Sequence, residues 1–140
     1  MSGIKIKRDE SEMEFLNKAR ELQIYSIRKC AHFPKRYTFY VSQPLAASAT
    51  RIHEYVKLGN SVYPTNAHEA QLRVDYFLKA RAELNNLVSQ IEVAAELFEF
   101  EPNVMKHWME LVSTELRLVT ALIKSDRARF RERFEEGHKS

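Results

Sequence analysis

The strongest concentration of charge that could bind a ligand lies near the C-terminus, in four closely spaced arginines: Arg127, Arg129, Arg131 and Arg133. On a helix the first and third share one face, and the second and fourth share another. Phe130 and Phe134 lie between them, one turn apart. Guanidinium groups bind phosphates and exposed rings dock on bases or proteins, so the segment predicts an arm that contacts RNA or a protein. The alternative is a solvated helix end whose arginines pair with nearby carboxylates.

A second basic group joins Lys35 and Arg36 to four aromatic residues: Phe33, Tyr37, Phe39 and Tyr40. Outward-facing rings beside cations would suit a nucleic-acid or protein partner. The alternative is that the rings form an apolar cap under the corner between two helices. The sequence leaves both interpretations open.

Residue types that could carry catalysis or hold a metal lack the spacing that such sites need. Di-iron bundles use two Glu-x-x-His pairs, which the five histidines do not provide. Cys30, the only cysteine, lies on an apolar stripe, where a cysteine is usually a small core residue. Three glycines cannot build a glycine-rich phosphate loop. We therefore expect a protein that is not an enzyme and has no catalytic residue, metal or cofactor.

Two charged residues interrupt apolar stripes and invite explanation. Arg81 lies between Phe77 and Leu84, and Glu115 lies on the line of Val112 and Val119. The simpler interpretation is that both flank the core and extend their charged ends into solvent. The other is an ion pair between helices or subunits that fixes their register.

The elements that must position these residues are marked out by seven glycines and prolines: Gly3, Pro34, Pro44, Gly59, Pro64, Pro102 and Gly137. Average usage would give roughly 17 such residues in a chain of this length. All but Pro44 fall at a terminus or between segments with helical periodicity. The pattern predicts an all-α fold, an antiparallel up-down-up-down four-helix bundle, because short links make neighbouring helices antiparallel.

The first helix is expected from Ser11, with Glu14 completing a capping box, to about His32. Its apolar stripe comprises Phe15, Ala19, Leu22, Ser26 and Cys30, widened by Leu16, Ile27 and Ala31. The second helix is expected from about Lys35 to Leu58, with a stripe of Phe39, Leu45, Ala46, Ala49, Ile52 and Val56. Pro44 interrupts it, so this helix is either kinked, which we favour, or begins at Pro44 with Ser42 or Gln43 near the cap.

The third helix is expected to begin at a capping pair, Asn66 with Glu69. Its stripe comprises Ala70, Val74, Phe77, Leu84, Val88, Ile91, Ala95 and Phe98. Pro102 ends this run and sets the first turn of a fourth helix. The buried face of that helix is expected to comprise Met105, Trp108, Val112, Val119, Leu122 and Ile123.

The composition limits the number of domains, the kind of partner and the cellular location that we expect. The 140 residues, 44% of them hydrophobic, fit one domain over 1–140, with a basic N-terminal arm (1–9) and a basic C-terminal helix end (128–140). The net charge of +3 permits an anionic partner without requiring one. The opening residues 1–8 hold no apolar stretch that would suit a signal peptide, and no apolar run is long enough to span a membrane, so we expect a soluble, cytoplasmic protein.

The chain resembles a known family at several places: Phe33-Pro34-Lys35-Arg36-Tyr37, the helix through Ile52, Asn60-Ser61, Arg73 with Tyr76 and Lys79-Ala80, the opening Ile4-Lys5-Ile6-Lys7-Arg8, and Lys124-Ser125-Asp126-Arg127. The resemblance is to the four-helix-bundle family of the accessory variability determinant (Avd) of diversity-generating retroelements and of the proteins encoded in 23S rRNA intervening sequences. Pro44 departs from the uninterrupted second helix expected of that family.

The resemblance implies a ring-like homo-oligomer, favouring a pentamer, whose basic surface binds RNA and a reverse transcriptase during mutagenic cDNA synthesis. The cations expected to bind nucleic acid are Lys35, Arg36, Arg51, Lys57, Arg73, Lys79, Arg127, Arg129, Arg131 and Arg133. The alternative is a structural or protein-interaction bundle of the intervening-sequence type without nucleic-acid affinity. A component of toxin–antitoxin or phage-defence systems is a third possibility.

Overall fold

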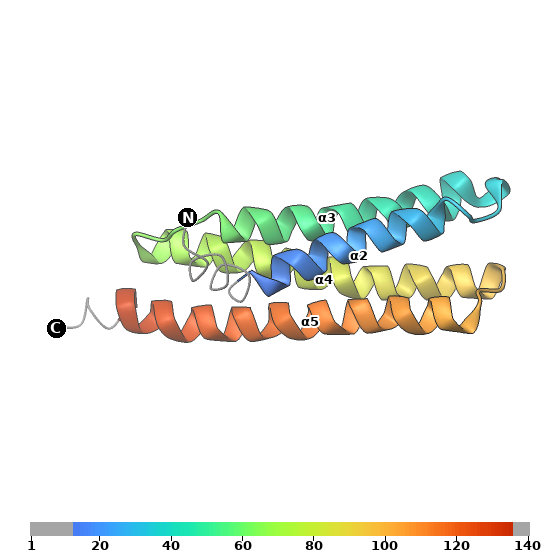
Figure 1. Ribbon diagram of the computed structural model, residues 1–140. Helices are drawn as coiled ribbons and strands as arrows, with labels where there is room; N and C mark the ends of the chain where they lie inside the picture. Colours follow the sequence, from blue (N-terminus) through green and yellow to red (C-terminus); the bar gives the residue numbers. More distant parts are fainter. Residues whose placement is uncertain (1–12, 136–140) are drawn as a thin grey trace, which may run out of the picture.

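The computed structural model describes residues 13–135, and these are helical without any strand. Four long helices run side by side as a bundle (Figure 1): α2 (Glu14–Cys30), α3 (Gln43–Asn60), α4 (Ala67–Leu97) and α5 (Pro102–Phe130). Three short helical turns accompany them: η1 (Lys35–Tyr37), η2 (Thr38–Ser42) and η3 (Arg131–Glu135). A four-helix fold is therefore confirmed. The predicted start at Ser11 and the N-terminal arm lie outside the described residues, as do the last residues of the C-terminal segment.

Two of the turns between helices meet at one end of the bundle, opposite the turn between α3 and α4 (Figure 1). The link from α2 to α3 contacts the link from α4 to α5 through aromatic rings. The ring centroid of Phe98 lies 4.6 Å from that of Phe33 and 5.4 Å from that of Tyr37. We call this end the aromatic end. The other end contains the turn between α3 and α4 and the C-terminal part of α5.

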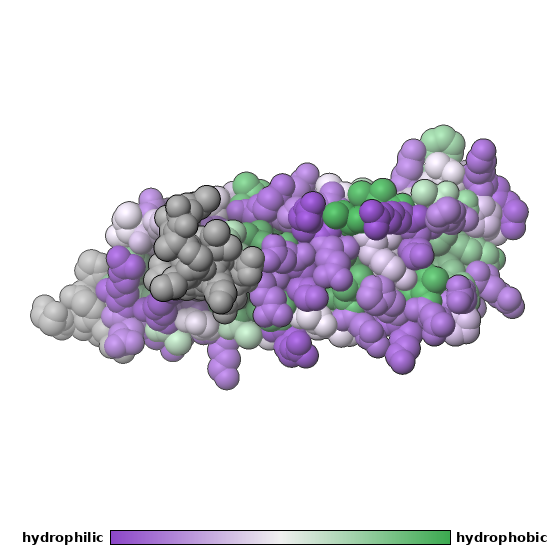
Figure 2. Space-filling view, viewed as in Figure 1, coloured by the Kyte–Doolittle hydropathy of each residue, from purple (hydrophilic) through white to green (hydrophobic). Residues whose placement is uncertain are grey.

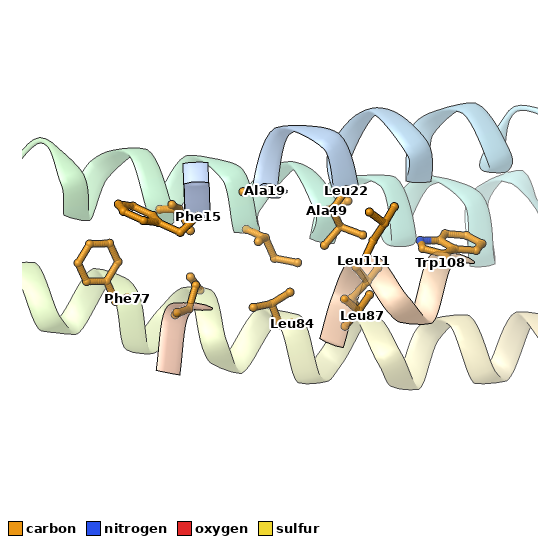
Figure 3. Packing of buried hydrophobic residues seen from close by; sticks show 14 of the residues in the cluster. Phe15, Ala19, Leu22, Ala49, Phe77, Leu84, Leu87, Trp108 and Leu111 are labelled. Carbon is orange, nitrogen blue, oxygen red and sulfur yellow. The ribbon is translucent and has the colours of Figure 1, made fainter. Parts of the chain in front are cut away.

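The core lies along the axis of the bundle, and α2 contributes the stripe that its sequence predicts. Phe15, Ala19, Leu22, Ser26 and Cys30 are all buried. Figure 3 shows side chains of α2, α3, α4 and α5 converging on this core. The buried polar residue in the α2 stripe has a partner, because Trp108 Nε1 donates a hydrogen bond of 2.9 Å to Ser26 Oγ. The widening residues Ile27 and Ala31, in contrast, are exposed.

The buried stripe of α4 differs from the prediction in its second half. Leu87 and Ala94 are buried, whereas Val88 is half-buried and Ala95 is exposed. At both places two apolar residues are adjacent in the sequence, and helical periodicity fits either of them. The prediction placed the less buried residue of each pair in the core. Phe98 lies beyond the helix in extended conformation and contacts the aromatic end instead.

The buried face of α5 also differs in detail from the prediction. Leu111 and Phe130 are buried in addition to the residues expected, whereas Met105 and Leu122 are only half-buried. The predicted centre of the face, with Trp108 at its core, is confirmed. The helix cap predicted for α4 is likewise confirmed, since the Glu69 N–H donates a 2.9 Å hydrogen bond to Asn66 Oδ1.

Pro44 marks the start of an α-helix and not a kink within one. The five residues of η2 form a π-helical turn, in which the Gln43 N–H bonds the carbonyl oxygen of Thr38, five residues earlier. Pro44 has no N–H with which to continue either that pattern or an α-helical one, so α3 begins with Pro44 in its first turn. The favoured kink is therefore wrong. The predicted place of Phe39 in the core is wrong too, because 74% of its surface is exposed.

Gly59 lies in the last turn of α3 and is required for the approach of α4. A Cβ atom at this position would lie 2.5 Å from Cε1 of Phe77, which is itself fully buried. The sequence had indicated only a helix stop here. In the structure the absence of a side chain allows the Phe77 ring to pack directly on the α3 backbone.

Glu115 does not extend into solvent, contrary to the simpler interpretation of its position. It is 0% exposed, and neither carboxyl oxygen has a hydrogen-bond partner. Burial raises the pKa of Glu115 to about 9, with Glu14 acting in the same direction and Lys18 against it. The side chain is therefore protonated at neutral pH.

The buried carboxyl predicts a pH-dependent stability that Glu115→Gln removes. The pKa is about 9 in the folded chain and near its ordinary 4.5 after unfolding, so unfolding releases a proton between these values. The free energy of unfolding of the native protein should fall relative to that of the variant by about 1.4 kcal/mol per pH unit across this window. Urea unfolding at pH 5, 6.5 and 8 measures the difference. Glu110→Gln, on the exposed face of α5, is the control; parallel curves for native protein and Glu115→Gln would contradict the assignment.

The contact at Gly59 predicts a steric penalty that depends on Phe77. Gly59→Ala should lower the free energy of unfolding by about 1–3 kcal/mol, because the added methyl group overlaps a ring that cannot move into solvent. In a Phe77→Leu background the same substitution should cost less. A double-mutant cycle by urea unfolding measures the coupling, and equal effects in both backgrounds would show that the ring is not the obstacle.

Candidate nucleic-acid interface

The structure divides the ten predicted cations into those whose charge is used within the bundle and those that face outward. Arg73 belongs to the first group. Its Nε atom lies 2.7 Å from Oδ2 of Asp126, and its Nη1 donates hydrogen bonds to the carbonyl oxygens of Gly59 and Val62. Its side chain is only 10% exposed. Arg73 therefore joins α4 to α5 and to the turn after α3. We exclude it from the residues that could contact nucleic acid.

Asp126 binds a second cation from its own helix. Arg129 Nη2 lies 2.8 Å from the other carboxylate oxygen, and its guanidinium lies 4.4 Å from the centroid of the Phe130 ring. The Asp126 side chain is fully buried, whereas that of Arg129 is 58% exposed. Arg129 can present one edge to a ligand, although its charge is shared with Asp126.

Arg51 is also paired within the bundle. Its guanidinium donates to both carboxylate oxygens of Glu83, at 3.1 and 3.0 Å, and so connects α3 to α4. The hydrogen bond to Glu83 is the main reason that the pKa of Arg51 is raised. Lys79 lies on the same pair of helices, with Nζ 5.9 Å from the Tyr55 ring centroid and 5.8 Å from that of Tyr76. Its cation thus lies near two aromatic rings and is exposed, like Lys57 at the end of α3.

A groove between α4 and α5 gathers outward-facing cations from both helices. It encloses about 330 Å³, and its charged lining residues are Arg81, Lys124, Arg127 and Arg131. The described residues that line it include no acid; Thr120, Ile123 and Ala128 complete the wall. We call it the cationic groove. Convergence of several cations at one groove is the arrangement that binding of a polyanion requires.

Two residues of the cationic groove were missed as site residues from the sequence. The spacing of Lys124, Arg127 and Arg131 places all three on one helix face, so Lys124 could have been found from spacing alone. Arg81 could not, because only the packing of α4 against α5 brings it to them. Arg81 is half-buried and therefore follows the simpler of its two interpretations: its charged end reaches the groove at the edge of the core.

Two more of the predicted cations lie at the aromatic end. Lys35 and Arg36 are exposed in η1, and the Arg36 guanidinium lies 4.9 Å from the centroid of the Tyr37 ring. The cap interpretation is confirmed for two of the four rings, and the other two are exposed. Phe33 and Tyr37 pack against Phe98 as a cap, whereas Phe39 and Tyr40 point away from it. In Figure 2 a hydrophobic group protrudes at the end where Figure 1 places η2, with hydrophilic residues around it.

Arg133 completes the set at the C-terminal side. Its guanidinium lies 5.1 Å from the centroid of Phe134, and the Phe134 ring stacks on that of Phe130 at 5.9 Å. Phe130 is buried, so the inner ring anchors the segment while Arg133 remains exposed. The predicted alternation of arginines and aromatics is thus a stacked arrangement on the bundle.

The described residues offer neither a cluster of metal ligands nor a reactive thiol. No three His, Cys, Asp or Glu side chains between residues 13 and 135 gather as metal ligands. Burial raises the pKa of the Cys30 thiol to about 12, which keeps it protonated and a poor nucleophile. Within the same residues, no helix combines the length and apolar character needed to cross a lipid bilayer.

The arrangement of cations is accordingly the feature of this chain that carries functional information. No family model matches the sequence, and no curated protein is similar enough to count as its relative. The candidate interface is therefore described from the positions of its own residues.

Proposed function

We propose that the protein is a non-enzymatic, RNA-binding accessory protein of the Avd type. The observation that carries the proposal is the cationic groove. Arg81 of α4 and Lys124 and Arg127 of α5 meet there without an acid among the described lining residues. Surface cations that are not neutralised by neighbours release counterions when they meet phosphates, which drives binding.

The proposed interface extends from the cationic groove to the exposed residues around it. Arg131 and Arg133 continue it along η3, and the exposed edge of Arg129 adjoins it. Arg73 supports this surface from within, because its charge is bound by Asp126, whereas Arg51 is paired with Glu83 between α3 and α4. Lys35, Arg36, Lys57 and Lys79 are exposed elsewhere on the bundle and are proposed as secondary contacts.

The wider biological role rests on the resemblance to the Avd family. The proposed protomer is an antiparallel bundle that assembles into a ring-like homo-oligomer, a pentamer in the favoured form. In the cytoplasm it would hold a template RNA against a reverse transcriptase during mutagenic cDNA synthesis. The protein would bind and position the RNA, and the polymerase would perform the chemistry.

A second candidate function is a structural or protein-interaction bundle of the intervening-sequence type, without affinity for nucleic acid. The observation that favours it is the internal pairing of Arg51, Arg73 and Arg129, which reduces the outward positive charge. Neighbouring genes discriminate between the two. A reverse transcriptase gene beside a variable repeat supports the first, and a location within an rRNA gene supports the second.

The groove predicts salt-dependent RNA binding that is lost on local charge reversal. Lys124→Glu/Arg127→Glu should weaken binding of a fluorescently labelled RNA at least tenfold at 100 mM salt. It should also reduce the slope of log K against log salt by about 2, because two phosphate contacts are removed. Fluorescence anisotropy over a salt series measures both quantities.

The matched control is Lys106→Glu/Arg117→Glu, which makes the same charge change on the same helix. These two residues line a different groove that also contains Glu110. The control should retain most of the affinity. Equal losses in the two variants would mean that only net charge matters, and salt-independent binding would refute a phosphate interface.

A further inference from the structure

The aromatic end exposes two neighbouring rings that the bundle itself does not use. Phe39 is 74% exposed and Tyr40 is 84% exposed, among the highest values for large apolar residues in the described chain. Exposure of two adjacent aromatic side chains costs hydrophobic free energy, and contiguous apolar surface of this kind commonly marks a contact site.

The backbone beneath these rings is fixed on both sides. Both residues belong to the π-helical turn η2, whose Val41 is buried and whose end is set by Pro44. On the other side Tyr37 stacks on Phe98, with ring centroids 5.4 Å apart. The rings are therefore held outward by a turn that is anchored in the core, so binding would require little ordering of the chain.

The segment that carries the rings is itself positively charged, which suits an anionic partner. No acid occurs from Leu22 to His53, a stretch that contains five Lys and Arg residues. Two of these, Lys35 and Arg36, are exposed in the turn immediately before the rings. Glu99 and Glu101 are acids in the link between α4 and α5. This link contacts the corner between α2 and α3 through the rings of Phe33, Tyr37 and Phe98.

We propose that Phe39 and Tyr40 form a stacking platform for unpaired bases of single-stranded RNA, with Lys35 and Arg36 contacting the adjacent phosphates. Rings beside cations bind single strands because every base has a π-face, whereas in a duplex those faces are covered by neighbouring bases. This inference rests on the proposed function and deepens it: the groove binds backbone, and the platform selects RNA that contains unpaired bases.

The test compares Phe39→Ala/Tyr40→Ala with the native protein on two labelled probes, a 20-nucleotide single strand and a blunt duplex of the same sequence. The variant should bind the single strand at least tenfold more weakly and the duplex within about twofold of native affinity. Both residues are exposed, so the fold is retained, as circular dichroism would verify. Val93→Ala, which truncates a 53% exposed apolar side chain on α4, is the control and should change neither affinity.

A second readout reports the stacking directly. Phe39→Trp retains a ring at the platform, so it should keep native affinity, and the fluorescence of the introduced indole should be quenched by the single strand but not by the duplex. The native Trp108 is fully buried and gives the constant background.

The outcomes separate this inference from the proposed function. If the native protein binds neither probe, the RNA-binding function fails and the platform with it. If the native protein binds RNA but the double variant binds the single strand equally well, only the platform is overturned. Equal weakening on both probes overturns it as well. So does a double variant that keeps its RNA affinity but no longer captures the reverse transcriptase, because the rings would then contact protein.

Discussion

The ion pair between Arg73 and Asp126 is the constraint on which the C-terminal half of the bundle depends. Both side chains are withdrawn from solvent, so each charge must be matched by the other and by additional polar partners. Two backbone carbonyl groups and Arg129 supply those partners. The pair therefore fixes α5 against α4 and against the turn after α3. The cationic groove lies on the same two helices, so the register that brings Arg81 to the cations of α5 is supported by this pair.

The same pair also adjoins the close approach of Phe77 to the backbone of α3. The Arg73 guanidinium lies 5.1 Å from the centroid of the Phe77 ring, and that ring packs on Gly59. A charged group, an aromatic ring and a bare backbone thus occupy one layer near the turn between α3 and α4. This layer explains why the chain uses glycine where a simple helix stop would accept several other residues.

The parts of the fold that could be predicted from sequence are those determined by local chemistry. The α2 stripe keeps one regular helical spacing from Phe15 to Cys30, and the Asn66 cap needs only residues within one turn. Predictions failed where adjacent residues were equally suitable, as at Leu87 and Val88, or where the outcome depended on a distant partner. Arg73 and Asp126 each lie on the buried stripe of their helix but are 53 positions apart, so only the packing of α4 against α5 shows that they pair. Glu115 was misjudged for a related reason, since its burial is decided by the helices packed around it.

The length of the bundle sets a scale for any ligand that would contact both ends. Pro102 begins α5 at the aromatic end and Arg127 lies in the cationic groove, 25 positions further along one uninterrupted helix. At 1.5 Å per residue this separation is about 38 Å. With bases stacked at about 3.4 Å per step, a strand must therefore extend over roughly 11 steps before it can occupy both places at once. The fixed length of this helix thus sets a minimum length, and a stacked oligonucleotide shorter than this would reach only one end of the protomer.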